Sequence, residues 1–415
     1  MATIFQIAVV SSLAVISRQV HAFSVLPAAP SSILRQSSNH HHHPNVNTAH
    51  GTMQRQSQLF AEKKNPVDEL SEERKENLFQ FLLRDMEVEG TPVLACDADQ
   101  AHTFQGTVWT VMAQLSENDI ESKACMVLQE MSIDSLQSFV DDFLAIKANE
   151  RLMEYLPELA RFNVTLLGRG VGPALVVETS NRTTAELEAV AKLESTFSDP
   201  NELTWTAAMK AFVARLGGWS EDKDDLPNPH AYRLAGSWDV CDTLATFWVS
   251  VCELLAQPED VLGSTILCLP ASKVDSDDSD SVQQARARFA ATTELVTESL
   301  FMARGQDLFD VSYLHPLYDR DNIHLVDNLY GHLPLLKSVP ALLKDSSAYD
   351  GNVDALTDND LKLQNYQRRS PLPAIFVRRQ SKKAKEDSTA AVFANLSKEG
   401  KEALQEALEK EMELV

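Results

Sequence analysis

Residues 313–334 are rich in histidine and aspartate, whose side chains could bind a metal or transfer a proton. Its three histidines, His315, His324 and His332, follow one another at intervals of 9 and 8 residues. Two histidines that bind zinc from one helix usually have the spacing His-x-x-x-His. A metal site built from His324 and His332 would therefore depend on loop geometry. The alternative is a polar loop whose side chains hydrogen-bond the local backbone.

His315 is also a candidate for acid–base chemistry. It follows a predicted strand, and Pro316 turns the chain directly after it. Ligands often bind at the carboxyl ends of strands in α/β sheets, so we expect His315 at the rim of a cleft. Imidazole can act as an acid or a base near neutral pH. His315 and Tyr318 are therefore the candidate catalytic residues, although no nucleophile-plus-base motif accompanies them.

Two adjacent arginines, Arg368 and Arg369, precede another predicted strand. Guanidinium groups bind carboxylate or phosphate through paired hydrogen bonds. Because acidic residues outnumber basic ones in this chain by 60 to 37, the two arginines could equally form internal salt bridges. Together with Asn365 and His315 they are the candidate ligand-binding residues. We expect at least one of the arginines to meet His315 and Tyr318 in space and to keep the imidazole neutral.

Two hypotheses for function follow from these residues. One is a binding or regulatory module that recognises a small anionic ligand or a protein partner. The other is an enzyme acting on a small anionic substrate, with His315 as acid or base and Arg368 or Arg369 as the anion clamp. No motif identifies a cofactor.

Other motifs have plain structural interpretations. The run Gly168 to Gly172 lies between two predicted strands, which favours a hairpin turn over a phosphate-binding loop. The aspartates of residues 272–281 lack the glycine and the closing glutamate of an EF-hand loop. Cys241 and Cys252 fall on the apolar stripe of a predicted helix, so we expect both in the core.

The elements that must position these residues are strands alternating with amphipathic helices. This pattern predicts an α/β (or α+β) fold with two helix-covered mixed-sheet domains, residues 66–182 and 203–380. We expect the polar tract 179–202 to divide them. A C-terminal helix is predicted within residues 391–415, with Ser397 as its cap.

Three stretches of the second half resemble a bacterial family called domain of unknown function 1415. They are Leu267–Pro270, the His315-Pro316-Leu317-Tyr318 segment and the segment from Asn365 to Pro371, and the likeness spans roughly residues 205–380. The family usually has a Cys-Pro pair after its first helix, where this chain reads Leu-Gly-Gly-Trp at residues 216–219. The resemblance implies no activity, because the function of that family is not established.

The N-terminal residues differ in composition from the rest. Residues 1–22 read as a signal peptide, because a mostly apolar stretch, residues 4–16, precedes small residues at the cleavage position. Residues 23–61 read as a disordered transit peptide, because they are rich in serine and the first acidic residue is Glu62. This order resembles the bipartite presequence of algae with secondary plastids, in which Phe23 would follow the signal cleavage. We therefore expect a soluble plastid protein, most simply in the stroma, with the secretory pathway as the alternative.

The charge of the chain limits its partners. Asp and Glu outnumber Lys and Arg by 60 to 37, giving a net charge of −23. Such a chain is repelled by nucleic acid and by anionic membranes. After the leader, no apolar stretch is long enough to span a bilayer. We expect small anionic ligands or plastid proteins as partners, and no integral membrane segment in the mature chain.

Overall fold

The first half of the described chain forms a four-stranded mixed sheet. The computed structural model describes residues 91–415 apart from 92, 97, 99, 129–130, 168–172, 198–200, 216–229, 260, 271–278, 323–329, 348 and 381–387. Strands β1 (Val93–Ala95), β2 (Ser122–Val127), β3 (Phe162–Leu167) and β4 (Ala174–Thr179) lie in the order β1-β2-β4-β3. The β1–β2 pair is parallel, and the other two pairs are antiparallel. The helices of this half are α4 (Ala101–Ser116), α5 (Ile133–Lys147) and α6 (Glu150–Tyr155).

The second half repeats this arrangement. Strands β5 (His230–Leu234), β6 (Ser264–Cys268), β7 (Phe309–Leu314) and β8 (Ala374–Arg379) lie in the order β5-β6-β8-β7. The β5–β6 pair is parallel and the others are antiparallel, as in the first sheet. Helix α9 (Val240–Ala256) connects β5 to β6, and α10 (Ser279–Met302) connects β6 to β7. Both halves therefore contain the same β-α-β-α-β-β unit.

The equivalence of the halves extends to single residues. Leu128 N–H donates to the Pro173 carbonyl at 2.9 Å, and Leu269 N–H donates to the Pro373 carbonyl at 2.9 Å. Counting outward from these prolines, the β3–β4 and β7–β8 pairs have the same register. Strand β3 reads FNVTLL and strand β7 reads FDVSYL, with Phe, Val and Leu in common. We infer that the two halves are copies of one module.

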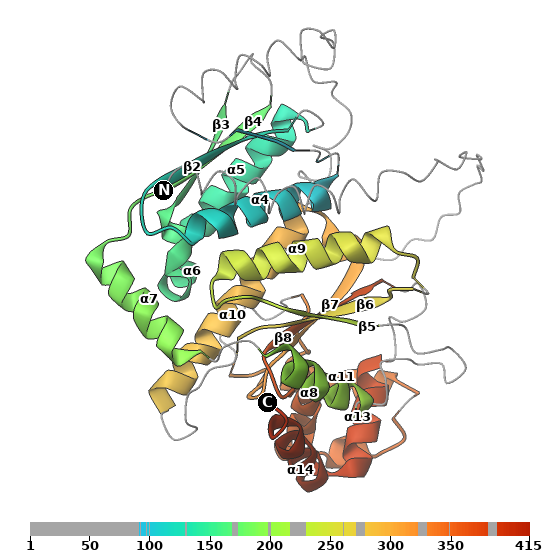
Figure 1. Ribbon diagram of the computed structural model, residues 1–415. Coiled ribbons are helices and arrows are strands. Elements are labelled where there is room, and N and C mark those ends of the chain that lie inside the picture. The colour runs from blue at the N-terminus through green and yellow to red at the C-terminus, as the bar shows by residue number, and fades with distance from the viewer. Residues whose placement is uncertain are drawn as a thin grey trace, which may run out of the picture.

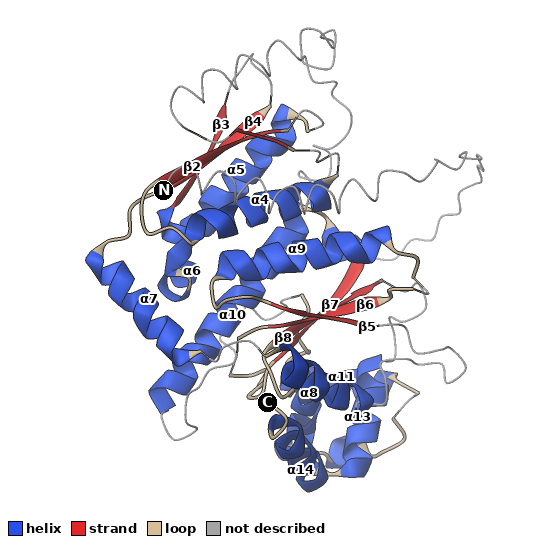
Figure 2. Ribbon diagram, viewed as in Figure 1, coloured by secondary structure: helices blue, strands red, loops and turns tan. Residues whose placement is uncertain are grey.

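The two copies pack together through their first helices. Helices α4 and α9 run side by side between the two sheets (Figure 1). One continuous core contains Trp109 and Met112 of α4, and Phe247 and Trp248 of α9. Figure 2 shows helices between the sheets and a second group of helices below the second sheet. The two predicted sheets thus exist, but they share this core.

A further helical layer covers the outer face of the second sheet. Helix α8 (Glu202–Arg215) packs Trp205 and Phe212 against that face. Helices α13 (Ser388–Glu399) and α14 (Lys401–Met412) form the C-terminal part, and α14 lies against α8 (Figure 1). Ser397 was expected to cap the last helix, but it lies inside α13. Gly400 (φ +82°) ends α13 and is the residue from which α14 starts.

Two connections contain short elements that were not predicted. The polar tract between the halves contains helix α7 (Thr184–Thr196), which Thr183 opens by exchanging hydrogen bonds with Glu186. The small elements after β7 are α11 (Val339–Asp345) and α12 (Asp358–Leu361). They lie in a long excursion, residues 315–372, between β7 and Pro373, the residue before β8. The corresponding connection in the first half, between β3 and Pro173, is residues 168–172; it has 5 residues and lies outside the described ones.

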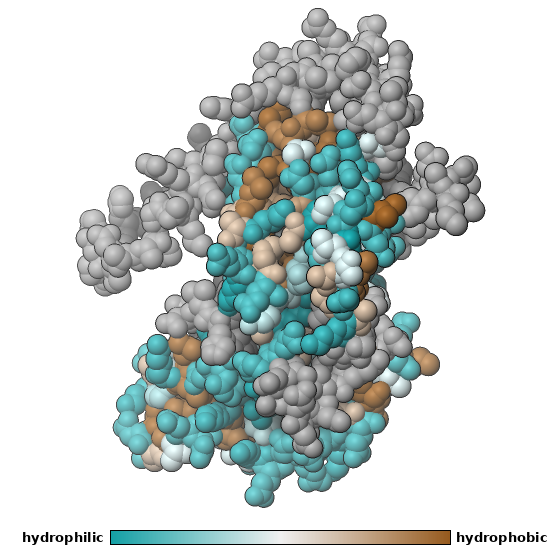
Figure 3. Space-filling view, turned by 90° about the vertical axis from the view of Figure 1, so that its left-hand side faces the viewer, coloured by the Kyte–Doolittle hydropathy of each residue, from teal (hydrophilic) through white to brown (hydrophobic). Residues whose placement is uncertain are grey.

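Hydrophilic residues cover much of the face in Figure 3, with hydrophobic residues in small groups among them. None of the described helices is long and apolar enough to cross a bilayer.

Cys241 is fully buried, and burial raises the pKa of its thiol. Cys252 is partly buried, and burial raises its pKa to about 12.

Candidate functional site

The residues predicted to form a site do meet where β7 ends. His315 lies directly after β7, and its backbone N–H donates to the Arg368 carbonyl at 2.9 Å. Arg369 Nε donates to the Tyr318 carbonyl at 3.1 Å. Asn365 Oδ1 accepts from a backbone N–H of the same loop, that of residue 320, at 3.2 Å. These contacts fasten the end of the excursion to its beginning.

The two arginines proposed as an anion clamp have structural contacts instead. The Arg369 guanidinium lies over the Tyr366 ring at 4.6 Å, and the Arg369 carbonyl accepts from Arg215 at 3.1 Å. Arg368 is enclosed, and burial lowers the pKa of its guanidinium to about 10. Neither arginine is among the residues that line the two cavities beside His315. The Arg369 guanidinium holds the loop through Tyr318 and Tyr366, and the role of the pair as an anion clamp stays a prediction.

A cavity of about 300 Å³ opens beside His315. Three elements form it: helix α6 of the first half, helix α10 of the second half, and the loop after β7. Its walls combine apolar side chains with charged groups of both signs. The lining residues are Arg151, Glu154, Tyr155, Gln283, Arg286, Ala287, Phe289, Ala290, Ala291, His315, Leu317, Tyr318, Asp319 and Asn322.

His315 presents a hydrogen-bond donor to this region. The Leu317 backbone N–H donates to His315 Nδ1 at 3.0 Å, so Nδ1 carries no proton. In a neutral imidazole the proton is then on Nε2. Burial, and secondarily the charge of Arg286, lowers the pKa of His315 to about 3. The imidazole is therefore neutral at pH 7, with Nε2–H as its remaining donor.

Arg286 is the arginine that faces His315, and it was not among the predicted site residues. It lies on α10 and lines the cavity. Its Nε is buried without a hydrogen-bond partner, and within the described part of the chain no ion pair involves its guanidinium. The expected effect of an arginine on His315 is thus present, but Arg286 causes it. In the sequence, Arg286 is one of several charged residues on an amphipathic helix, and nothing marks it out.

Tyr318 and His332 belong to a closed hydrogen-bond chain. The Leu333 backbone N–H donates to the Tyr318 hydroxyl at 3.2 Å, which leaves that hydroxyl to donate to His332 Nδ1 at 3.1 Å. His332 Nε2 then donates to Thr293 Oγ1 at 3.3 Å. Both His332 nitrogens are used, and burial lowers the pKa of this imidazole to about 3. This chain orders the loop and leaves no lone pair of His332 for a metal.

The remaining metal and phosphate candidates lie elsewhere. His324, the glycines 168–172 and most of the aspartate-rich loop 272–281 are outside the described residues. Among the residues that the structure describes, no group of three His, Cys, Asp or Glu side chains could hold a metal ion.

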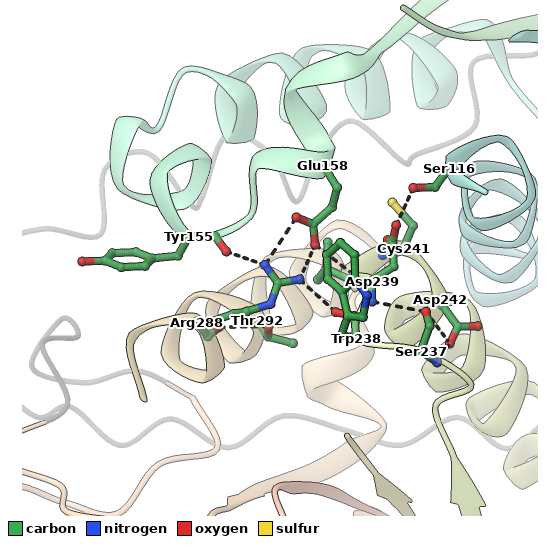
Figure 4. A network of polar contacts seen from close by, with 11 residues as sticks. Ser116, Tyr155, Glu158, Ser237, Trp238, Asp239, Cys241, Asp242, Arg288 and Thr292 are labelled. Carbon is green, nitrogen blue, oxygen red and sulfur yellow. Dashed lines mark hydrogen bonds and ion pairs between the residues drawn. The ribbon is translucent and has the colours of Figure 1, made fainter. Parts of the chain in front are cut away.

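A second polar cluster lies at the junction of the halves (Figure 4). Arg288 of α10 pairs with Glu158 of η1 (Pro157–Arg161) at 2.5 Å, and both side chains are buried. The same Glu158 carboxylate accepts from the Val240 backbone N–H, at the start of α9, at 3.1 Å. Negative charge at a helix N-terminus is stabilising. Glu158 therefore links the first half to two helices of the second half.

Asp239 is the acidic N-cap of α9 beside this ion pair. Its carboxylate accepts from the Cys241 backbone N–H at 2.7 Å and from the Ser116 hydroxyl. Burial and the nearby charge of Glu158 raise the pKa of Asp239 to about 6. A small cavity of about 50 Å³ adjoins Arg288 and also touches His315. It is too small for an organic ligand, so we interpret this cluster as structural.

No protein-family model, curated protein or solved structure matches this chain. The geometry of the cavity is therefore the basis for a functional argument.

Proposed function

We propose that this protein binds a small anion in the cavity between α6, α10 and the loop after β7. The proposal rests on one observation: the elements by which the two copies of the module differ meet at this cavity. Helix α6 follows α5 in the first half, whereas α10 reaches β7 through a single short turn in the second. The 315–372 excursion replaces a connection of 5 residues. These two additions come together at the same cavity.

This convergence supports a role in binding. Each copy forms its four-stranded sheet with the same order and register, so the sheet needs neither addition. Helix α6 and the long loop after β7 enclose a cavity together, although the shared fold does not need them. Binding of a ligand in that cavity would explain why they are present. Ligand sites are usually concave and mostly apolar, with a few converging polar groups. The cavity beside His315 has this composition.

The polar groups of the cavity favour an anion. Arg286 has no ion-pair partner among the described residues, and the His315 Nε2–H has no acceptor there. Arg151 also lines the cavity, but it pairs with Glu294. A carboxylate or phosphate oxygen would accept from the guanidinium and the imidazole together. Charge-assisted hydrogen bonds of this kind are about twice as strong as neutral ones.

The same geometry favours binding over acid–base catalysis. A general base needs an unprotonated nitrogen that faces the substrate, and the free nitrogen of His315 carries the proton. Its pKa of about 3 is also far from the range in which imidazole transfers protons efficiently at pH 7. Tyr318 donates its hydroxyl proton to His332. Binding is therefore the role that these side chains support best.

Thermal denaturation of the full chain with small carboxylates and with phosphate tests the proposal. A ligand that binds the folded state raises the melting temperature by mass action. We expect such a rise for at least one anion in the wild type and its loss in Arg286→Met. The matched control is Arg233→Met, because Arg233 is a half-exposed arginine on the distant strand β5. A rise that survives in Arg286→Met would contradict this site.

We place this binding in the plastid, on the composition of residues 1–61. A fluorescent fusion of residues 1–65 is expected to enter the plastid, and Phe23→Arg to divert it, because a charge replaces the aromatic residue at the proposed import signal. Plastid fluorescence from the Phe23→Arg fusion would contradict the role of this residue. The resemblance to the bacterial unknown-function family stays a prediction.

A further inference from the structure

The cavity beside His315 contains an acceptor as well as donors. Asp319 lines it, and Asn322 Nδ2 donates to Asp319 Oδ2 at 2.7 Å. The other oxygen, Oδ1, is buried and has no hydrogen-bond partner among the described residues. A buried carboxylate oxygen without a donor costs free energy that a bound donor recovers. The residues that line the cavity thus include an acceptor without a partner as well as donors without partners.

The remaining wall of the cavity is apolar. Phe289 is buried and packs against the His315 ring, with the ring centroids 4.8 Å apart. Ala290, Leu317 and Tyr155 continue this wall. A volume of about 300 Å³ equals that of about ten water molecules in the liquid, enough for an organic molecule. An inorganic ion would leave most of this apolar surface in contact with water.

We infer that the ligand is a small organic molecule with three parts: an anionic group, an apolar body, and a hydroxyl or ammonium group that donates to Asp319. Free amino acids and 2-hydroxy acids with apolar side chains have these parts. Arg286 and His315 hold the anionic group, and Phe289 packs against the body. The inference rests on the proposed anion binding and adds the chemical class of the ligand.

The polar groups of the cavity disfavour two simpler classes of ligand. A dicarboxylate would bring a second negative charge toward Asp319, which like-charge repulsion disfavours. A simple apolar acid would satisfy Arg286 but leave Asp319 Oδ1 without a donor. A donor on the ligand removes that cost, and an ammonium group adds charge attraction.

Three probes that differ in one group test this inference by calorimetric titration of the full chain. 3-Phenylpropanoate, 3-phenyllactate and phenylalanine share a phenyl ring and a carboxylate, and the last two add a hydroxyl or an ammonium group. We expect one or both of the last two to bind at least about tenfold more tightly than 3-phenylpropanoate, a difference of about 1.4 kcal/mol. Succinate and phosphate are expected to bind more weakly than all three.

Two variants assign the effect to residues. Asp319→Asn is expected to remove the preference for phenylalanine while 3-phenylpropanoate still binds, because the amide keeps the shape of the carboxylate but loses its charge. Arg286→Met is expected to abolish binding of all three probes. The control is Asp345→Asn on the exposed surface of α11. Circular dichroism of each variant checks that it is folded.

The outcomes separate the two proposals. Equal affinities of the three probes, or a preference for phenylalanine that persists in Asp319→Asn, would overturn the ligand class and leave the anion site standing. Binding of 3-phenylpropanoate that survives Arg286→Met would overturn the anion site itself. Absence of binding by every probe at about 10 mM, where a Kd of about 1 mM is still detected, would overturn both.

Discussion

Glu158 and Arg288 form a buried ion pair that joins the two copies of the module. Their closest atoms are 2.5 Å apart, and the exposed fractions of the side chains are 1% and 7%. The pair is separated by 130 residues in the sequence. Arg288 also donates to the Trp238 carbonyl at 2.8 Å and lies over the Trp238 ring. The contact between the halves therefore combines a shared apolar core with a fully desolvated charge pair.

Loss of one partner of this pair should destabilise the protein strongly. Arg288→Ala leaves the Glu158 carboxylate buried without its cation, at a cost of about 3–5 kcal/mol in the free energy of unfolding. Arg233→Ala removes a surface ion pair with Glu253 and should cost about 1 kcal/mol or less. Urea denaturation of both variants measures the difference. Equal costs would show that the Glu158 pair contributes no more than a surface contact.

The raised pKa of Asp239 should make the protein less stable as pH rises from about 4 to 6. In this interval the folded state keeps the proton that the unfolded state releases, because the pKa is about 6 when folded and 3.8 as the ordinary value. Between pH 4 and 6, each unit of rising pH lowers the free energy of unfolding by about 1.4 kcal/mol. Asp239→Asn should abolish this contribution, because the amide does not titrate; its oxygen can still accept from the Cys241 N–H, and its NH2 group can donate to the Ser116 hydroxyl. Urea titrations at pH 4, 5 and 6 check it, with exposed Asp350→Asn as control. A pH dependence unchanged in Asp239→Asn would refute the assignment.

His315 and His332 should act in the opposite direction. Burial lowers both pKa values to about 3, so between pH 6.5 and 3 the unfolded state binds protons that the folded state does not. Their contribution to stability is full above pH 6.5 and decreases as pH falls. Nitrogen-15 NMR should find both imidazoles neutral at pH 5 with the proton on Nε2. The same protein in urea, where histidines titrate near pH 6.5, is the control. An Nδ1–H signal or a charged ring at pH 5 from either residue would contradict the hydrogen-bond assignment.

The equivalence of the two copies predicts equal costs at equivalent positions. Phe162 begins β3 and Phe309 begins β7, and both side chains are fully buried. Phe162→Ala and Phe309→Ala should each lower the free energy of unfolding by about 3–5 kcal/mol. Ile120→Ala, at a residue that is 69% exposed, should change it by less than about 0.5 kcal/mol. Urea denaturation gives all three values, and a large inequality between the phenylalanines would argue that their surroundings differ.

The sequence by itself determined the local structure. Alternation of apolar residues in FDVSYL and helical spacing around Cys241 depend on side-chain direction along one element, which is a local property. For this reason the α/β class, the strand before His315 and the buried Cys241 could be predicted. The likeness of FNVTLL to FDVSYL was also present in the sequence. Its meaning became clear from the identical strand order and register of the two sheets.

The tertiary structure decided which charged groups face one another. Arg368 and Arg369 lie beside Ser-Pro at the start of a strand, which made them the natural candidates for a clamp. The packing of α10 across the loop brings Arg286 to His315, whereas Arg369 donates to the Tyr318 carbonyl and Arg368 is buried. Similarly, the pairing of Glu158 with Arg288 requires two helices from different halves to meet. Such contacts depend on the order of strands and the packing of helices, which the periodicity of a single segment does not encode.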